Sequence, residues 1–361
     1  MIYRLLFALS EDVSAFNVFR YLTLRTALAT LTALLLSLIL GPMVIRSLQQ
    51  LQVAQVTREE GPAHHAVKTG TPTMGGLLII TSVVVPTLLW ADPGNVFVWM
   101  AVLSCIAFGV IGFIDDYIKV VRRHNLGLTS GRKFALQVVA AAGLGTALVL
   151  LAGEGQFTTD LAFPFFKNLQ PDLGWFFIIA VIVVVVGSAN AVNLTDGLDG
   201  LAIGSVGIAS GTFAILCYAT GNIRIAEYLA IPFVRGAGEL TILCGSLVGA
   251  SLGFLWYNCH PAEVFMGDVG SMALGGTIGT LAVLTKQEIV LMLVGGLFVV
   301  EALSVILQVG SFRLRGRRIF RMAPLHHHFE LAGWPESKVI IRFWIAAVIF
   351  ALMSLATLKL R

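Results

Sequence analysis

Charged residues are scarce in this sequence. Asp, Glu, Lys and Arg make up 12% of its 361 residues, whereas 57% are hydrophobic and the mean hydropathy is +0.88. A soluble domain carries roughly 25% charged residues, so the chain has about half the expected charge. That composition excludes a disordered chain, a coiled coil and an ordinary soluble enzyme, and it indicates a polytopic membrane protein.

Cysteine is also scarce, and the four residues show no CxxC spacing. They support neither a disulfide framework nor a zinc site, and we interpret them as small buried hydrophobic residues. The formal net charge is +4. A basic excess is normal where cytoplasmic loops face anionic lipid, so no nucleic-acid partner is needed to explain it.

Long apolar runs dominate what remains. Crossing the hydrocarbon core takes about 20 apolar residues, and ten runs meet or approach that length. The chain is therefore predicted to be an all-α membrane protein with ten transmembrane helices in one domain, residues 1–361. The first 21 residues are expected to form an interfacial helix, because Arg4, Glu11 and Asp12 break their apolar run. The predicted spans are Thr26–Ile45, Thr69–Ala91, Pro93–Ile114, Phe134–Gly153, Leu173–Thr195, Gly200–Ile223, Leu240–Ala262, Val269–Thr285, Ile289–Phe312 and Phe343–Leu358.

The distribution of Lys and Arg predicts the orientation. With the N-terminus outside, the inside loops hold 14 of these residues and the outside segments hold nine. The positive-inside rule then places both termini in the periplasm. The unusual polar motifs of the chain all fall on the inside, so the candidate site is predicted to lie on the cytoplasmic face.

Five acids dominate those motifs. Asp115 and Asp116 end the third span, Asp196 and Asp199 join the fifth and sixth, and Asp268 opens the eighth. Acids at a helix C-terminus oppose its dipole, and no equal supply of cations is evident nearby in the sequence. The cluster therefore predicts a divalent metal, and oxygen ligands without cysteine favour Mg²⁺ or Mn²⁺.

Other residues suit phosphate chemistry. Lys68 and Lys133 open two spans from the inside and are candidate phosphate ligands, although either could be a generic inside lysine. Glycines beside Asp196, Asp199 and Asp268 allow tight turns before helix N-termini, which bind anions. His326, His327 and His328 form an internal triplet, of which at least one is free for acid–base chemistry. Glu301 lies within the ninth span and marks either function or a buried partner.

These motifs resemble the phospho-N-acetylmuramoyl-pentapeptide-transferase family, within the polyprenyl-phosphate N-acetylhexosamine-1-phosphate transferase superfamily (glycosyltransferase 4). The resemblance runs along the whole chain. The matching segments are KTGTPTMGG from Lys68, FIDDYIK at Phe113–Lys119, NAVNLTDGLDGLA at Asn190–Ala202, VFMGDVGS at Val264–Ser271 and APLHHHFE at Ala323–Glu330.

The resemblance implies a reaction in peptidoglycan synthesis at the bacterial inner membrane. UDP-N-acetylmuramoyl-pentapeptide and undecaprenyl phosphate would give lipid I and UMP, with Mg²⁺ as cofactor. Members of the family are usually dimeric, so the resemblance also implies a homodimer. It implies catalytic roles for Asp115, Asp116, Asp268, His326, His327 and Lys133, with Asp268 as metal ligand. The implied substrate-binding residues are Lys68, Thr73, Asn193, Asp196, Asp199, Asn258, Phe265, Gly267 and His328.

Two rival interpretations stay open at this point. A related enzyme would use UDP-N-acetylglucosamine, but the HHHFE segment argues against it. An ion-coupled transporter would place acids at mid-depth in two repeated halves, whereas here the acids other than Glu301 fall at span ends. Whether transfer takes one step, or two through an aspartyl phosphate, is also open, and we favour one step.

Overall fold

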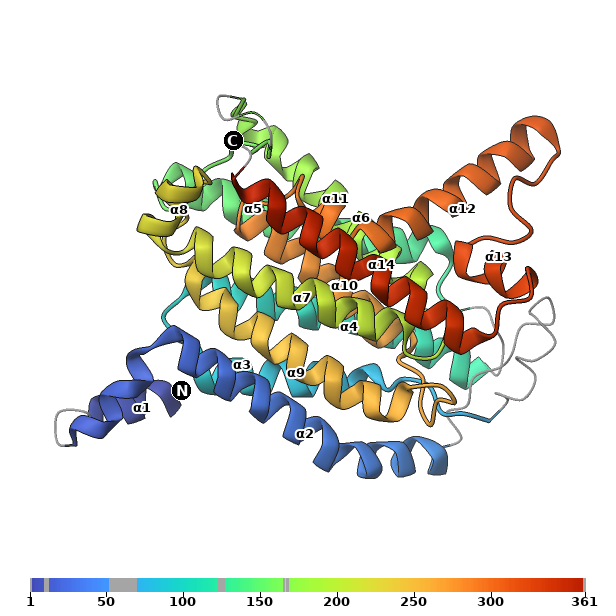
Figure 1. The fold of residues 1–361 in the computed structure, drawn as a ribbon, viewed down its shortest axis with the longest axis horizontal. Helices are drawn as coiled ribbons and strands as arrows, with labels where there is room; N and C mark the ends of the chain where they lie inside the picture. The colour runs from blue at the N-terminus through green and yellow to red at the C-terminus, as the bar shows by residue number, and fades with distance from the viewer. Residues whose placement is uncertain are drawn as a thin grey trace.

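The computed structural model describes residues 2–9, 13–51, 70–122, 127–164, 166 and 169–359. Within them, the ordered elements are helices, apart from isolated bridge residues such as the antiparallel pair Asp160 and Asp172. The long helices run side by side in one bundle (Figure 1). The prediction of an all-α polytopic membrane protein is therefore confirmed.

Each of the ten predicted spans coincides with a helix. Nine helices in the described residues are long and apolar enough to cross a membrane, and one further apolar helix is shorter. The ninth predicted run is divided at Gly295. The helices are α2 (Leu22–Gln50), α3 (Gly76–Trp90), α4 (Val96–Arg122), α5 (Ser130–Gly153), α6 (Phe177–Thr195), α7 (Leu201–Thr220), α9 (Leu240–Asn258), α10 (Gly267–Leu284), α11 (Leu291–Val294), α12 (Gly296–Arg315) and α14 (Glu336–Ala356).

Helix α3 is the short one, because it begins seven residues later than the predicted span. Pro72 cannot donate a backbone hydrogen bond, and Met74 has a φ of 69°, so the preceding segment does not continue the helix. It pairs instead with the loop before α10. Phe265 N–H donates to the Pro72 carbonyl (2.8 Å) and Gly75 N–H donates to the Phe265 carbonyl (2.9 Å). The start of α3 is thereby attached to the start of α10.

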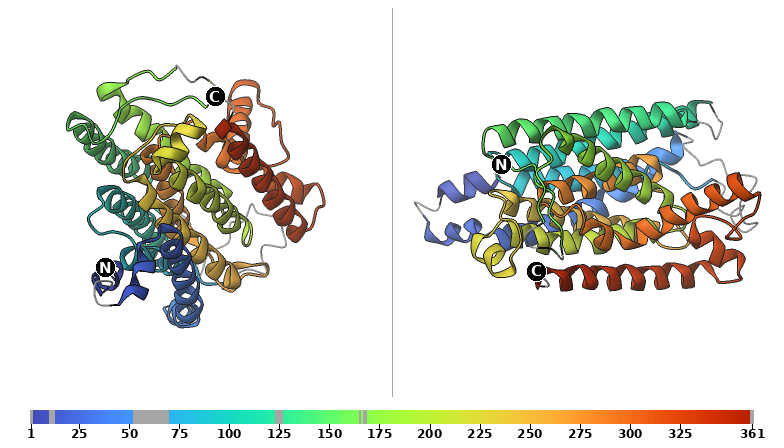
Figure 2. Two further views of the ribbon diagram at one scale, coloured as in Figure 1. Left: turned by 60° about the vertical axis from the view of Figure 1, so that its left-hand side comes forward. Right: turned by 90° about the horizontal axis from the view of Figure 1, so that it is seen from above.

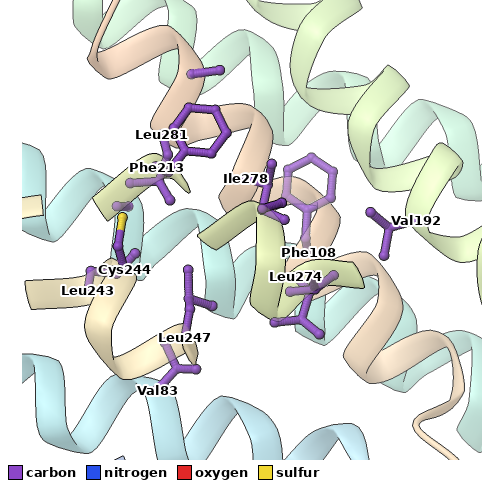
Figure 3. Packing of buried hydrophobic residues seen from close by; sticks show 14 of the residues in the cluster. Val83, Phe108, Val192, Phe213, Leu243, Cys244, Leu247, Leu274, Ile278 and Leu281 are labelled. Atoms are coloured by element: carbon purple, nitrogen blue, oxygen red, sulfur yellow. The ribbon is translucent and has the colours of Figure 1, made fainter. Parts of the chain in front are cut away.

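Helix α10 forms the centre of the bundle. All of its residues from Val269 to Leu284 are buried, and it packs against α3, α4, α6 and α7. Figure 3 shows Phe108 of α4 beside Leu274 and Ile278 of α10. Gly276 makes this contact possible, because a Cβ there would lie 2.5 Å from the ring of Phe108. Small residues let membrane helices approach this closely.

A glycine stripe joins α9 to α2. Gly245, Gly249 and Gly253 recur every four residues, so they share one face of α9. A Cβ at Gly249 would meet the Thr30 carbonyl of α2 at 2.0 Å, and one at Gly253 would meet the side chain of Ser37 at 2.6 Å. The two helices therefore pack backbone against backbone, as membrane helices with small residues at every fourth position do.

The two ends of the bundle differ. Both chain termini lie at one end, and the helix ends that carry the polar motifs lie at the other (Figure 1). Exposed aromatic residues occur near both ends, with Trp175 and Tyr228 at the first and Trp256 at the second. Such residues mark membrane–water interfaces. The predicted interfacial segment forms α1 (Ile2–Ala8) and a 3₁₀ turn at Ser14–Arg20, outside the bundle.

Candidate functional site

Three acids that are distant in the sequence meet at the polar end of the bundle. Asp115 and Asp116 lie on the last two turns of α4 and are buried, while Asp268 lies on the first turn of α10. One carboxylate oxygen from each lies within 4.8 Å of the others. The backbone N–H of Val269 also donates to Asp116 (3.2 Å). The arrangement is a three-carboxylate cluster at a helix N-terminus.

Two lysines neutralise much of this cluster. Lys119 Nζ lies 2.7 Å from Asp115, 3.3 Å from Asp116 and 2.6 Å from Asp268. Lys133 Nζ, from the first turn of α5, lies 2.9 Å from Asp268 and 3.6 Å from Asp115. Three carboxylates and two ammonium groups leave one net negative charge, so the site can accept a further cation.

These contacts correct two steps of the sequence argument. The acids do have local cations, and α4 does not end at them but continues to Arg122. In the sequence, Lys119 falls just beyond the predicted third span, where it is one of the 14 basic residues of the inside loops. Its spacing of three and four residues from the two acids is the helical spacing of an ion pair, and that signal could have identified it once the helix was extended past Ile114.

The turn between α6 and α7 lies next to the cluster. Asn193 donates from Nδ2 to Asp268 (2.6 Å) and to the hydroxyl of Ser271 (2.8 Å). Asp196 follows α6 directly and is half-buried. Its burial, and next the carboxylates of Asp268, Asp116 and Asp199, raise the pKa of Asp196 to about 8. This side chain is therefore suited to being neutral near pH 7, or to facing a cation.

Gly267 and Thr73 lie next to Asp116 of the cluster. Gly267 has a φ of 70°, a conformation that favours glycine. A Cβ at this position would lie 2.6 Å from Asp116 Oδ2 and 2.9 Å from the Thr73 hydroxyl. The structure thus brings Thr73, Gly267 and Asp116 together. Lys68 lies outside the described residues.

A second polar group lies around Asp199, which is buried. Asp199 Oδ2 accepts the N–H of Ala262 (3.1 Å) and lies 3.3 Å from His260 Nδ1. The backbone N–H of Asp199 donates to Glu336 of α14 (3.1 Å). Sequence reasoning cannot identify His260 or Glu336, because nothing in the local pattern joins positions so far apart.

Asn258 is the last residue of α9, and Phe265 lies on the loop that links α9 to α10. The buried amide of Asn258 accepts the N–H of Gly200 (3.0 Å) and donates to the Val264 carbonyl (2.8 Å). It therefore ties the α6–α7 turn to this loop and organises the site through backbone contacts. Phe265 is half-buried, and its backbone is hydrogen-bonded to the extended segment before α3, at Pro72 and Gly75.

The histidine triplet lies on α13 (Leu325–Leu331), and its members differ. The side chain of His326 is fully buried, with Nδ1 3.3 Å from Glu301. Its Nε2 faces the α6–α7 turn, because a Cβ on Gly197 would lie 2.3 Å from it. His327 Nδ1 lies 2.8 Å from Glu330, and His328 Nδ1 accepts the N–H of Arg321 (3.1 Å).

Glu301 explains how α13 is held. Its buried carboxylate accepts the N–H groups of Leu325 (2.7 Å) and His326 (3.2 Å). A carboxylate at this place satisfies helix N–H groups that would otherwise lack partners. The acid inside the ninth predicted span thus has a buried partner, and it fixes the histidine-bearing helix from across the bundle.

The fold and the site define a membrane-embedded transferase of the glycosyltransferase 4 type, and sequence comparison agrees. A sequence model described as Glycosyl transferase family 4 matches residues 98–286. A signature described as Phospho-N-acetylmuramoyl-pentapeptide-transferase signature 1 matches residues 68–80.

Similar proteins cover the chain completely. A phospho-N-acetylmuramoyl-pentapeptide-transferase from Geobacter sp. (strain M21) is 60% identical over the whole of both chains. Proteins with the same description from Citrifermentans bemidjiense and Koribacter versatilis are 58% and 56% identical, again over the whole of both chains. The chain belongs to the phospho-N-acetylmuramoyl-pentapeptide-transferase family.

Proposed function

We propose that this enzyme transfers phospho-N-acetylmuramoyl-pentapeptide from its UDP-linked form to undecaprenyl phosphate, yielding lipid I and UMP. The observation that carries the proposal is the three-carboxylate cluster with its two lysines at one end of a membrane bundle. Diphosphate chemistry needs such a combination of metal ligands and fixed cations. The printed descriptions of the full-length relatives supply the particular substrate class.

The donor set fits Mg²⁺. Asp115, Asp116 and Asp268 each offer a carboxylate oxygen within a common radius, and Mg²⁺ prefers oxygen ligands, including one or two carboxylates beside substrate phosphates. Mn²⁺ accepts the same ligands. Bound there, such an ion would withdraw charge from the diphosphate oxygens. We propose Asp268 as its principal ligand, because Asp268 lies between the two lysines and also accepts a hydrogen bond from the Asn193 amide.

The residues of the chain then have separable roles. Lys119 and Lys133 bind and neutralise the phosphate oxygens as negative charge develops on the departing UMP. Asp115 and Asp116 orient the acceptor phosphate. A phosphate monoester has a second pKa near 6, so the acceptor is largely dianionic at neutral pH and needs no strong base.

A single displacement follows from these roles. A phosphate oxygen of the acceptor attacks the β-phosphorus, the bond from that phosphorus to the bridging oxygen breaks, and UMP departs with the electron pair. The rival two-step route needs a free carboxylate nucleophile. Asp115 is instead engaged by Lys119 at 2.7 Å and by the backbone N–H of Leu128 at 2.7 Å, which supports the one-step route.

The test is a detergent assay of UMP release with both substrates and Mg²⁺. We expect release to stop with EDTA, to resume with added Mg²⁺ or Mn²⁺, and to be lost in Asp268→Asn. Asp172→Asn is the matched control, because Asp172 is an exposed acid that precedes α6, at the opposite end of that helix from Asn193. Activity with UDP-N-acetylglucosamine in place of the muramoyl substrate would reassign the enzyme within the superfamily, and inactivity with both would contradict the proposal.

We further propose that the site faces the cytoplasm of a bacterial inner membrane and that both termini face the periplasm. The excess of Lys and Arg in the loops at the site end supports this orientation, as does the placement of both termini at the opposite end. Alkaline phosphatase fused after Arg361 should be active in cells, and a fluorescent protein that folds only in the cytoplasm should stay dark there. The reverse pattern would invert the proposed orientation.

A further inference from the structure

The end of α12 stands away from the rest of the bundle (Figures 1 and 2). Five arginines lie at or just beyond this end, all with exposed side chains: Arg313, Arg315, Arg317, Arg318 and Arg321. No Asp or Glu occurs between Glu301 and Glu330. In the described part of the chain, none of the five guanidinium groups forms a salt bridge with a carboxylate. We call residues 308–321 the arginine arm.

The arginine arm is folded rather than loose. The side chain of Gln308 donates to the Phe320 carbonyl (2.9 Å) and accepts the N–H groups of Ile319 (3.0 Å) and Phe320 (2.9 Å). The Ser311 hydroxyl donates to the Arg317 carbonyl (2.9 Å). These four bonds fold the segment after α12 back along the helix, so the arginines are held close together.

Apolar side chains surround the helix that carries the arm. Ile306, Leu307 and Phe312 are 64%, 53% and 56% exposed, and Leu314 between two of the arginines is 86% exposed. Four large apolar side chains on several sides of one helix cannot all face water at low cost. They are suited to acyl chains, and the arginines beyond them are then at the depth of the lipid headgroups.

We propose that the arginine arm binds the phosphate headgroups of anionic phospholipids in the leaflet next to the catalytic site. Guanidinium groups bind phosphate oxygens in bidentate fashion, and clusters of four to eight basic residues beside a transmembrane helix bind anionic lipids. The arm is open to the bulk bilayer, where phospholipids are the abundant source of such groups. The proposal does not depend on the proposed reaction.

The arm also contacts the histidine helix. Arg321 donates from its backbone to His328 (3.1 Å) and from Nη1 to the Leu331 carbonyl at the end of α13 (2.5 Å). The depth of the arm in the headgroup region therefore also determines the depth of α13 relative to the membrane surface. Phe320 of the arm also packs on the ring of His328 (centroids 5.8 Å apart), so lipid binding and the position of the histidine triplet are coupled.

The test is a titration of the full chain, in a neutral detergent, with fluorescent phosphatidylglycerol followed by anisotropy. Arg313, Arg315, Arg317 and Arg318 are replaced together by Gln in one variant and by Lys in another. One basic residue near an anionic lipid contributes about a fivefold factor in binding. We expect the Gln variant to bind at least tenfold more weakly, the Lys variant to bind within about threefold of the parent, and added salt to weaken both the parent and the Lys variant.

Two controls keep the result interpretable. Arg224→Gln with Arg235→Gln removes two basic residues, one in α8 (Ile223–Leu229) and one just after it, and Figure 1 places α8 at the opposite end of the bundle. This change should leave binding unchanged, as should unlabelled phosphatidylcholine as competitor. The Gln variant must also keep the thermal unfolding temperature of the parent; Arg317→Gln with Arg318→Gln serves in its place otherwise. Equal binding by parent and Gln variant overturns the proposal. Displacement by undecaprenyl phosphate, but not by excess phosphatidylglycerol, would make the arm an acceptor site instead.

Discussion

Gly112 offers a sharp test of how α4 and α10 hold the three-carboxylate cluster. A Cβ at Gly112 would lie 2.1 Å from the carbonyl oxygen of Asp268, 2.5 Å from its carbonyl carbon and 2.7 Å from the nitrogen of Val269. Carbon–oxygen contacts of this kind settle at about 3.3 Å or more. Because the neighbouring atoms are backbone, they cannot rotate away. In Gly112→Ala the two helices must therefore separate locally by about 1 Å.

That separation moves Asp268 relative to Asp115 and Asp116. A displacement of about 1 Å at a reacting group can cost about a hundredfold in rate, so we expect kcat for UMP release to fall by about that factor. The change should appear in kcat more than in the KM for the nucleotide, since the displaced group acts on the transferring phosphate. Thermal unfolding of the purified variant reports whether the bundle itself survives.

The same helix and its neighbour supply matched controls. Gly143 in α5 has nothing within 4 Å of its added Cβ, so Gly143→Ala should keep full activity and gain up to about 1 kcal/mol from the better helix propensity of alanine. Gly109 in α4 would meet only the terminal methyl of Ile80, at 2.4 Å, which can rotate away. If Gly112→Ala is as active as Gly109→Ala, the packing argument for Asp268 is refuted.

Further predictions concern the charges of the site. Lys119→Met should lose at least a hundredfold in kcat because the remaining ammonium cannot neutralise the developing charge. Because the Lys119 ammonium contacts the same three carboxylates that would hold the metal, the variant should bind Mn²⁺ at least as tightly as the parent when titrated by electron paramagnetic resonance; weaker Mn²⁺ binding would show that Lys119 and the metal do not compete for these acids. Glu301→Gln should lower the free energy of unfolding by about 2 kcal/mol and also reduce kcat, because an amide cannot accept both N–H groups of α13; an unchanged denaturation midpoint would show that α13 is held otherwise. Since the pKa of Asp196 is raised to about 8 from about 4 when unfolded, the folded state holds its proton more tightly and the native protein loses stability as the pH rises from 4 to 8. In EDTA, Asp196→Asn should therefore gain more in thermal unfolding temperature over the parent at pH 8 than at pH 5, and a constant difference would contradict the raised pKa.

The helices could be predicted from the sequence because lipid leaves few alternatives. Backbone groups in hydrocarbon must bond within their own segment, so each long apolar run becomes a helix. The start of α3 is the exception. The segment around Pro72 is extended because it pairs with Phe265, on a loop almost 200 residues further along the chain. Hydropathy reports which residues enter lipid but not which of them remain extended against a partner.

The site was predictable in part. The motifs fall at helix ends on the same side, and alternation of direction along the chain brings such ends together; Asp115, Asp116 and Asp268 do meet. Lys119 cannot be assigned from hydropathy, because the predicted third span ends with the apolar run at Ile114, whereas α4 continues to Arg122. The bonds from Glu301 to α13 and from Glu336 to Asp199 join distant segments, and a single sequence carries no record of such contacts.

The shortness of α3 determines where the reaction occurs. Fifteen residues span about 22 Å, roughly 8 Å less than the hydrocarbon core, and the missing length lies at the end where α3 and α10 start together. The three-carboxylate cluster therefore lies below the membrane surface. A water-soluble nucleotide sugar must enter this recess from solution, whereas a prenyl-linked acceptor can reach it by lateral diffusion with its chain still in the bilayer. The two substrates thus arrive at right angles, one from solution and one from within the plane of the membrane.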